Sequence, residues 1–335
     1  MCIPGNKYQN PFIIFFMGIF LVLSSGCGSP STSTSALSSP AIQHLYVAQS
    51  GSVGILSLTA SGNVAPDASI TGANTELNDV LNIAFDSHGN IYVVNDGAGL
   101  PGGYVTVYAA GSSGNAAPTG TIPTGGIIGS NTGLNGPSGI ALGPDDKIYV
   151  TNSNGNTITV YSPGASGNVT PLATISGAAT GLNDPLAIAV DTSGKIFVAN
   201  GLSDSLTVYA AGANGNVAPI AIISGSNTGL SNPNGLFVDP RDNIYVANFD
   251  DNSVTIYAAG SSGNAMPTAT IGGSNTGLLS PWGVALDTKG NIYVSNNTPP
   301  SILVYAAGTD GNVAPAATII STDGRFATLR GVAVH

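Results

Sequence analysis

The sequence reads IAVDTSGKIFVAN over residues 188–200, LFVDPRDNIYVAN over residues 236–248 and VALDTKGNIYVSN over residues 284–296. These three copies stand 48 residues apart, and each holds two apolar runs on either side of a polar turn that begins with Asp. Repetition at a fixed period of this length is the signature of a repeat architecture. The repeat therefore decides the fold before any single motif is considered.

Two independent markers count the repeat units. One is the aromatic residue in the second apolar run, and the other is a Gly-Asn-x-x-Pro motif. The aromatic residues are Tyr46, Tyr92, Tyr149, Phe197, Tyr245 and Tyr293. The asparagines of the second marker are Asn63, Asn115, Asn168, Asn216, Asn264 and Asn312. Both markers give six units.

Each unit contains four short apolar or β-branched runs separated by Gly, Pro, Asn and Asp, which is typical of strands and turns. In the fourth unit these runs cover residues 186–190, 195–199, 205–209 and 219–223. None has the length and the 3.6-residue period of a helix. The pattern predicts an all-β fold, namely a six-bladed β-propeller of four-stranded antiparallel blades.

The two ends of the repeat region predict how the ring closes. The first unit lacks its first strand and begins at His44, whereas residues 331–335 at the C-terminus match the missing strand. We expect the C-terminal strand to pair into the first blade. Such pairing removes the open sheet edge that would otherwise invite association with other chains.

Residues 281–305 resemble the NHL repeat, with Pro-x-Gly followed by an apolar strand and Asp, then Gly-Asn-Ile-Tyr-Val, then a strand ending in Val-Tyr. The resemblance covers residues 42–335 and implies a six-bladed propeller. Ser, Thr or Asn replaces the Arg that is common before the third strand of NHL repeats. Because NHL proteins include enzymes, adhesins and assembly platforms, the fold does not settle the function.

The N-terminal segment predicts export. Lys7 precedes an apolar run over residues 12–23, and small residues follow, so we interpret residues 1–26 as a signal peptide. The run is shorter than the about 20 residues that a membrane-spanning helix needs. The stretch LSSGC at residues 23–27 resembles a bacterial lipobox, although Ser24 stands where that motif prefers Leu, Val or Ile. The resemblance implies lipidation of Cys27, and an ordinary signal peptide is the alternative.

Residues 27–41 are rich in Ser, Thr and Pro and predict a flexible tether in front of the propeller at residues 42–335. We therefore expect an exported monomer, anchored to the bacterial cell envelope through its N-terminal lipid alone. In a Gram-negative host, Gly28 in place of Asp points to the outer membrane, because lipoproteins with Asp after the acylated cysteine stay in the inner membrane.

Charge and cysteine content exclude several classes of function. Only 7% of the residues are charged, with 17 acidic against 7 basic side chains, so nucleic acid is not expected as a partner. The two cysteines both lie within the first 27 residues, so disulfides and thiol nucleophiles are excluded from the folded part.

A polar amide ends the second strand of every unit. These residues are Asn95, Asn152, Asn200, Asn248 and Asn296, with Gln49 in the first unit. Two interpretations stay open. The amides satisfy backbone groups between strands, or they ring the channel mouth and bind sugar hydroxyls, a peptide or a cation.

Four aspartates are candidate metal ligands near two of these asparagines. They are Asp184, Asp204, Asp250 and Asp251. Carboxylate and amide oxygens are the ligands that Ca²⁺ prefers, so this group predicts a calcium site, with solvated loop aspartates as the alternative. No other cofactor is expected.

Trp282 is the only tryptophan, and the corresponding residues of other units are Ser138, Leu186 and Asn234. It is a candidate ligand-binding residue, and the alternative role is a lid over the core.

We expect a binding or interaction module without catalytic activity, with a polysaccharide or an envelope protein as its partner. The three histidines do not repeat in register, and no Gly-x-Ser-x-Gly elbow is present. Two alternatives remain, a calcium-dependent hydrolase or lyase similar to propeller lactonases, and a structural assembly scaffold.

Overall fold

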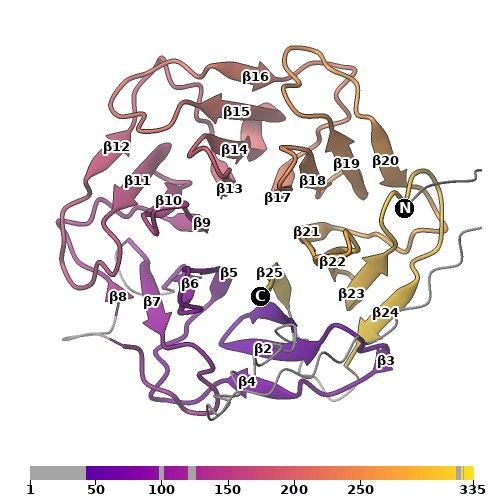
Figure 1. The fold of residues 1–335 in the computed structure, drawn as a ribbon, viewed down its shortest axis with the longest axis horizontal. Coiled ribbons are helices and arrows are strands. Elements are labelled where there is room, and N and C mark those ends of the chain that lie inside the picture. The colour runs from indigo at the N-terminus through magenta and orange to yellow at the C-terminus, as the bar shows by residue number, and fades with distance from the viewer. Residues whose placement is uncertain (1–42, 98–101, 120–125, 322–325, 327) are drawn as a thin grey trace, which may run out of the picture. The chain divides into compact units, whose positions relative to one another are not determined.

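The computed structural model describes residues 43–97, 102–119, 126–321, 326 and 328–335, and Ile42–His335 form one compact unit. The predicted export signal, Cys27 and the tether lie outside the described residues. Six small sheets stand side by side in a ring, and the first strand of each contacts the first strands of its two neighbours (Figure 1). The predicted six-bladed β-propeller is therefore confirmed.

Blades two to four are four-stranded antiparallel sheets with their first strand innermost (Figure 1). Blade two contains β5 (Val80–Phe85), β6 (Ile91–Asn95), β7 (Tyr104–Tyr108) and β8 (Gly126–Ile127). Blade three contains β9 (Pro137–Leu142), β10 (Ile148–Asn152), β11 (Thr157–Tyr161) and β12 (Ala173–Ile175). Blade four contains β13 (Pro185–Val190), β14 (Ile196–Asn200), the 3₁₀ turn η1 (Gly201–Ser203), β15 (Ser205–Tyr209) and β16 (Ala221–Ile223).

Blades five and six repeat this order. Blade five contains β17 (Pro233–Val238), β18 (Ile244–Asn248), β19 (Ser253–Tyr257) and β20 (Ala269–Gly272). Blade six contains β21 (Pro281–Leu286), β22 (Ile292–Asn297), β23 (Pro300–Tyr305) and β24 (Ala317–Ile320). The fourth strand of blade four is shorter than predicted, beginning at Ala221 rather than at residue 219, where proline has no N–H to donate to a ladder.

Blade one joins the two ends of the chain. Its strands are β25 (Leu329–Val334), β1 (His44–Gln49), β2 (Ser52–Ser57) and β4 (Ala68–Ile70), in that order from the centre outward. β25 pairs antiparallel with β1, and the N–H groups of His44 and His335 each donate to the other residue's carbonyl, at 2.7 and 3.0 Å. The predicted closure by the C-terminal strand is confirmed.

The ring is also joined along its outer edge. The short strand β3 (Gly62–Asn63) of the first unit pairs parallel with β24 of blade six. A single parallel bridge occupies the same place at each of the other five interfaces. These bridges are Ile70 to Gly114, Ile127 to Gly167, Ile175 to Gly215, Ile223 to Gly263 and Ile271 to Gly311. Every blade is thus bonded to its neighbour at the rim as well as packed against it.

The Gly-Asn-x-x-Pro motif forms this outer joint. The Asn216 side-chain oxygen accepts the Ala179 backbone N–H of the preceding unit at 2.8 Å. Gly177 makes room for that amide, because it has a φ of +113° and an added Cβ would lie 2.6 Å from Asn216 Oδ1. The equivalent asparagines Asn115, Asn168, Asn264 and Asn312 accept backbone N–H groups in the same way. The asparagine of the motif that marks each repeat therefore forms an interblade hydrogen bond.

The hydrophobic core lies between adjacent blades. Phe197 and Leu206 of blade four, for example, pack in one cluster with Leu236 and Val246 of blade five. The last residue of the third strand is a buried tyrosine in blades two to six, and its hydroxyl donates to a backbone carbonyl in the loop before the blade. These tyrosines are Tyr108, Tyr161, Tyr209, Tyr257 and Tyr305. Burial raises the pKa of three of them, Tyr161, Tyr209 and Tyr257, to about 12, so they stay protonated donors.

Candidate functional site

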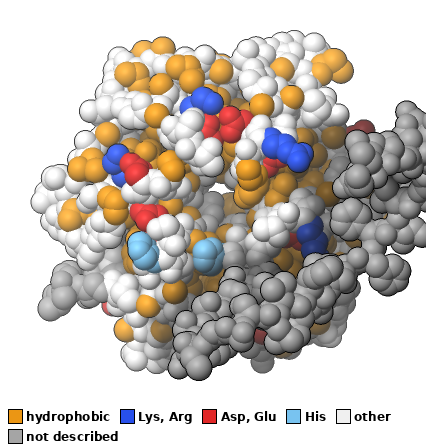
Figure 2. All heavy atoms as spheres, viewed as in Figure 1, with side chains coloured by type: hydrophobic (Ala, Val, Ile, Leu, Met, Phe, Trp, Pro, Cys, Tyr) orange, Lys and Arg blue, Asp and Glu red, His pale blue; other side chains and the backbone are white. Residues whose placement is uncertain are grey.

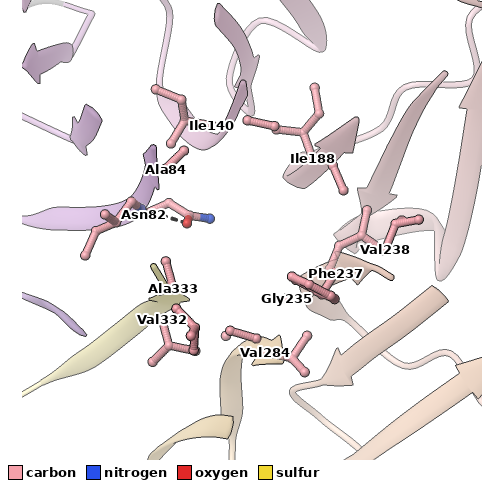
Figure 3. Close-up of a pocket in the computed structure, with 18 of the residues that line it drawn as sticks. Asn82, Ala84, Ile140, Ile188, Gly235, Phe237, Val238, Val284, Val332 and Ala333 are labelled. Carbon is pink, nitrogen blue, oxygen red and sulfur yellow. Dashed lines mark hydrogen bonds between the residues drawn. The ribbon is translucent and has the colours of Figure 1, made fainter. Parts of the chain in front are cut away.

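The six inner strands surround a narrow cavity of 220 Å³ (Figure 3). Its wall is mostly apolar, with Ile140 from β9, Ile188 from β13, Val284 from β21 and Val332 from β25. Within the described residues, no carboxyl, imidazole, amino, guanidinium, thiol or phenol side chain lines this cavity. The cavity can therefore hold a ligand but offers no acid or base of its own.

Small residues at the third position of the inner strands keep the channel narrow. They are Gly139, Ala187, Gly235, Gly283 and Gly331. An added Cβ at Gly235 would lie 2.5 Å from the Trp282 carbonyl oxygen of the next blade. An added Cβ at Gly331 would lie 2.8 Å from the Leu81 carbonyl oxygen. Neighbouring inner strands thus approach more closely than a larger side chain would allow.

Asn82 of β5 is the one polar residue at this third position. Its Oδ1 accepts the Ile83 backbone N–H at 2.8 Å, which fixes the amide, and the side chain points into the cavity among apolar neighbours (Figure 3). Sequence reasoning missed this residue. The signal was present, because Asn82 replaces the Gly or Ala of every other blade.

Trp282 stands at the second position of β21, at one end of this cavity, and is partly exposed. The Phe249 ring, from the loop after β18, meets the indole edge-on at 90°, with 5.8 Å between ring centres. On the other side, the Arg330 guanidinium carbon lies 4.6 Å from the centre of the indole ring. Cation–π attraction and the aromatic contact hold the indole in one orientation.

Arg330 occupies the second position of β25 and was also missed by sequence reasoning. Its guanidinium lies 3.4 Å from the Asp79 carboxylate, and its Nε–H is buried without a hydrogen-bond partner among the described residues. The other inner strands carry Leu81, Ser138, Leu186, Asn234 and Trp282 at this position. We call the surface formed by Asp79, Phe249, Trp282 and Arg330 the channel mouth.

The asparagines that end the second strands are fully buried. Asn95 Oδ1 accepts the Asn78 backbone N–H at 3.0 Å, and Nδ2 donates to Thr106 Oγ1 at 3.1 Å. The four remaining side chains each accept one backbone N–H and donate across the blade in the same way. They are Asn152, Asn200, Asn248 and Asn296. Of the two interpretations, this geometry supports the one in which the amides satisfy backbone groups.

Gln49, the counterpart of these asparagines in blade one, is also buried, with 6% of its surface exposed. Its side chain lies over the neighbouring strand β2, since an added Cβ at Gly54 would be 2.7 Å from Gln49 Nε2. The side chain fills the space that the glycine leaves.

The four candidate metal ligands do not converge. Asp204 Oδ1 accepts the Asn232 backbone N–H of the next blade at 2.7 Å, as Asn156 and Asn252 do for their next blades. Asp204 therefore links its blade to the next one. For a second candidate, Asp184, burial raises the pKa of the carboxyl. The other two candidates, Asp250 and Asp251, belong to the turn after β18. Among the described residues, no three His, Cys, Asp or Glu side chains are placed to hold a metal ion, and the calcium site stays a prediction.

Comparison with known families identifies the class of protein. The model of the family described as "Lactonase, 7-bladed beta-propeller" matches residues 43–270, so the chain belongs to this lactonase family. Its own ring has six blades where the family description gives seven. No curated protein matches the chain.

Solved structures agree on the propeller fold. The chain is 19% identical to a chain of a nidogen/laminin complex, with a TM-score of 0.63, and the match covers 87% of this chain and 98% of the other. It is 12% identical to a protein of unknown function from Bacteroides caccae, with a TM-score of 0.59 and the same coverage. It is 13% identical to an inactive virginiamycin B lyase from Staphylococcus aureus bound to quinupristin, with a TM-score of 0.50, covering 80% and 82%. These likenesses show the fold alone.

Proposed function

We propose that this lactonase-family propeller is a binding module of the bacterial cell envelope without catalytic activity, and that it binds a polysaccharide or an envelope protein at the channel mouth. The observation that carries the proposal is the partly exposed Trp282, held between Phe249 and Arg330. A rigid aromatic side chain with a fixed cation beside it is the kind of group that dominates binding energy at recognition surfaces.

The chemistry of the adjoining cavity supports binding rather than catalysis. The described side chains that line it are apolar or carry neutral amides, as Asn82 and Asn234 do. Acid–base catalysis needs a titratable group within hydrogen-bond reach of the reacting atoms. Neutral amides instead suit the hydroxyl and carbonyl groups of sugars and peptides.

Replacing Trp282 tests the proposal. A glycan array and a pull-down from the host envelope, both with protein that begins at Ala36, identify the ligand. We expect Trp282→Ala to weaken its binding at least about tenfold, the equivalent of 1.4 kcal/mol, because the substitution removes the contact surface and leaves the Arg330 guanidinium without its aromatic partner. Isothermal titration calorimetry measures the change.

Leu186→Ala is the matched control, because Leu186 has the same position in β13 and is also partly exposed. We expect it to leave the affinity within about twofold. Equal affinity of the Trp282→Ala variant and the native protein, with both folded, would contradict a binding role for the mouth.

The family match favours one second candidate, hydrolysis of a lactone or a related ring-opening reaction. The native protein is therefore assayed for lactone opening with and without added Ca²⁺. Turnover above the uncatalysed rate would overturn the proposal of a binding module without catalysis.

Anchoring through Cys27 is part of the same proposal and rests on the lipobox-like sequence before it. In a bacterial host we expect the mature chain to begin at a diacylated or triacylated Cys27 and to fractionate with membranes, because each buried CH₂ of an acyl chain contributes about 0.8 kcal/mol. Mass spectrometry of the N-terminal peptide measures the modification. A mature N-terminus with unmodified Cys27 would contradict the anchor. The described residues contain no helix long and apolar enough to cross a membrane.

A further inference from the structure

A second concave surface lies between blades five and six, at the end of the inner strands away from Trp282. It is a groove of 720 Å³ between the β17–β18 turn and the β21–β22 turn, and Phe237, Tyr245, Arg241, Asn243, Thr288 and Lys289 line it. Basic and acidic side chains surround the central opening on the face that Figure 2 shows. We call this surface the interblade groove.

The two carboxylates of the groove are occupied by their own turns. Asp239 accepts the backbone N–H groups of Arg241 and Asn243 at 2.8 and 2.9 Å, and the Asn243 side chain at 2.9 Å. Asp287 makes the same three contacts within the β21–β22 turn, at 2.8 to 2.9 Å. Turn N–H groups therefore hold both carboxylates within their own turns.

The two cations of the groove, by contrast, are not paired with a carboxylate among the described residues. On blades three and four, Lys147 lies 2.6 Å from Asp145, and Lys195 lies 3.4 Å from Asp242 of the next blade. Arg241 and Lys289 make no ion pair with any of the residues that the structure describes, and both side chains are exposed.

The reason can be read in the repeat. Asp146 and Asp242 occupy the last position but one of their turns and bond to the preceding blade, Asp146 to Ser87 and Asp242 to Lys195. In blade six this position is Gly290. The carboxylate that would face blade five is therefore missing from the groove.

Two aromatic side chains line the groove beside these cations. Phe237 and Tyr245 contact edge to face, with 6.4 Å between ring centres. Phe237 is a departure from the repeat, because the other inner strands carry alanine at this position, namely Ala84, Ala141, Ala189, Ala285 and Ala333. It lines both the groove and the channel cavity (Figure 3).

We propose that the interblade groove binds an anionic sugar chain through its carboxylates. The planar Arg241 guanidinium can pair with a carboxylate through two parallel hydrogen bonds, and Lys289 supplies a second positive charge across the groove. The rings of Tyr245 and Phe237 offer an apolar surface to the C–H face of a sugar. This site is independent of the channel mouth, since Trp282 lies at the other end of β21.

The test is calorimetric titration with an oligogalacturonate, using protein that begins at Ala36 and so contains the whole compact unit. We expect Arg241→Gln to weaken binding at least about tenfold and Lys195→Gln, which alters a cation already paired, to change it less than about twofold. Trp282→Ala is expected to leave this affinity unchanged, so the two sites can fail separately. Binding is expected to weaken with added salt, and neutral dextran is expected not to bind.

Two outcomes would overturn the proposal. They are the absence of oligogalacturonate binding to the native protein, with or without binding of dextran sulfate, and equal losses in Arg241→Gln and Lys195→Gln. Melting temperatures of all variants establish that each is folded. We expect them to stay close to that of the native protein, because substitutions of exposed side chains change stability by less than about 0.5 kcal/mol.

Discussion

Removing residues 331–335 is expected to destabilise the whole ring and not only its last strand. The deletion takes most of β25 from the centre of blade one, where Tyr46 pairs with Ala333 and Val47 pairs with Val332. It exposes the inner edge of β1 and removes the wall of the channel between β21 and β5. Since domains are stable by only about 5 to 15 kcal/mol, we expect a fall in melting temperature of more than about 10 °C or a failure to fold.

Circular dichroism during heating measures this effect. His335→Ala is the matched control, because it removes only the imidazole that stacks on Phe85 at 4.4 Å and keeps the backbone ladder. It should lower the melting temperature by a few degrees at most. A truncated chain that melts with the native protein would show that the ring does not depend on this closure.

Replacing one buried asparagine is expected to be nearly as damaging. Asn95→Ala removes the side-chain oxygen that accepts the Asn78 N–H and the amide that donates to Thr106 Oγ1, in a place where the asparagine is 0% exposed. Each buried polar group that loses its partner costs about 1 to 3 kcal/mol. We expect a loss of about 3 kcal/mol or more, measured as a lower melting temperature.

Asn95→Asp separates the hydrogen bonds from side-chain volume. It keeps the shape and the acceptor but removes the donor and buries a charge, so it should destabilise at least as much as alanine. Asn227→Ala is the surface control, since this side chain is exposed, and it should change stability by less than about 0.5 kcal/mol. If Asn95→Ala left stability intact and abolished binding to the ligand found with the array, the ring of amides would be a binding site after all.

The architecture could be predicted because every blade repeats the same backbone pattern of strands and turns. The period, the six aromatic residues and the orphan C-terminal strand each depend on the backbone pattern, and the pattern survives when single side chains change. The Gly-Asn-x-x-Pro motif can be counted from the sequence, but its role is visible only in the structure, where Asn216 accepts the Ala179 backbone N–H beside Gly177.

The candidate site was predicted only in part. Trp282 was found because it breaks the repeat, and the same criterion would have found Asn82, Phe237 and Arg330. Arg330 was missed because the C-terminal strand predicted from the sequence begins at residue 331, whereas β25 begins at Leu329. A sequence also cannot tell an amide that faces a ligand from one that faces a backbone N–H, which is why Asn200 and its counterparts stayed ambiguous. The sequence likewise cannot show that the Asp204 carboxylate faces the Asn232 backbone N–H and not a metal ion.

The place where the chain enters the propeller has a mechanical consequence. β1 lies between β25 and β2 and is bonded to both along its length. A force that pulls on residue 43 along the strand would have to shear two antiparallel ladders at once, instead of unzipping a single edge. When force is applied through the N-terminus, we therefore expect the pairing of β1 with β25 and β2 to be the last part of the domain to break.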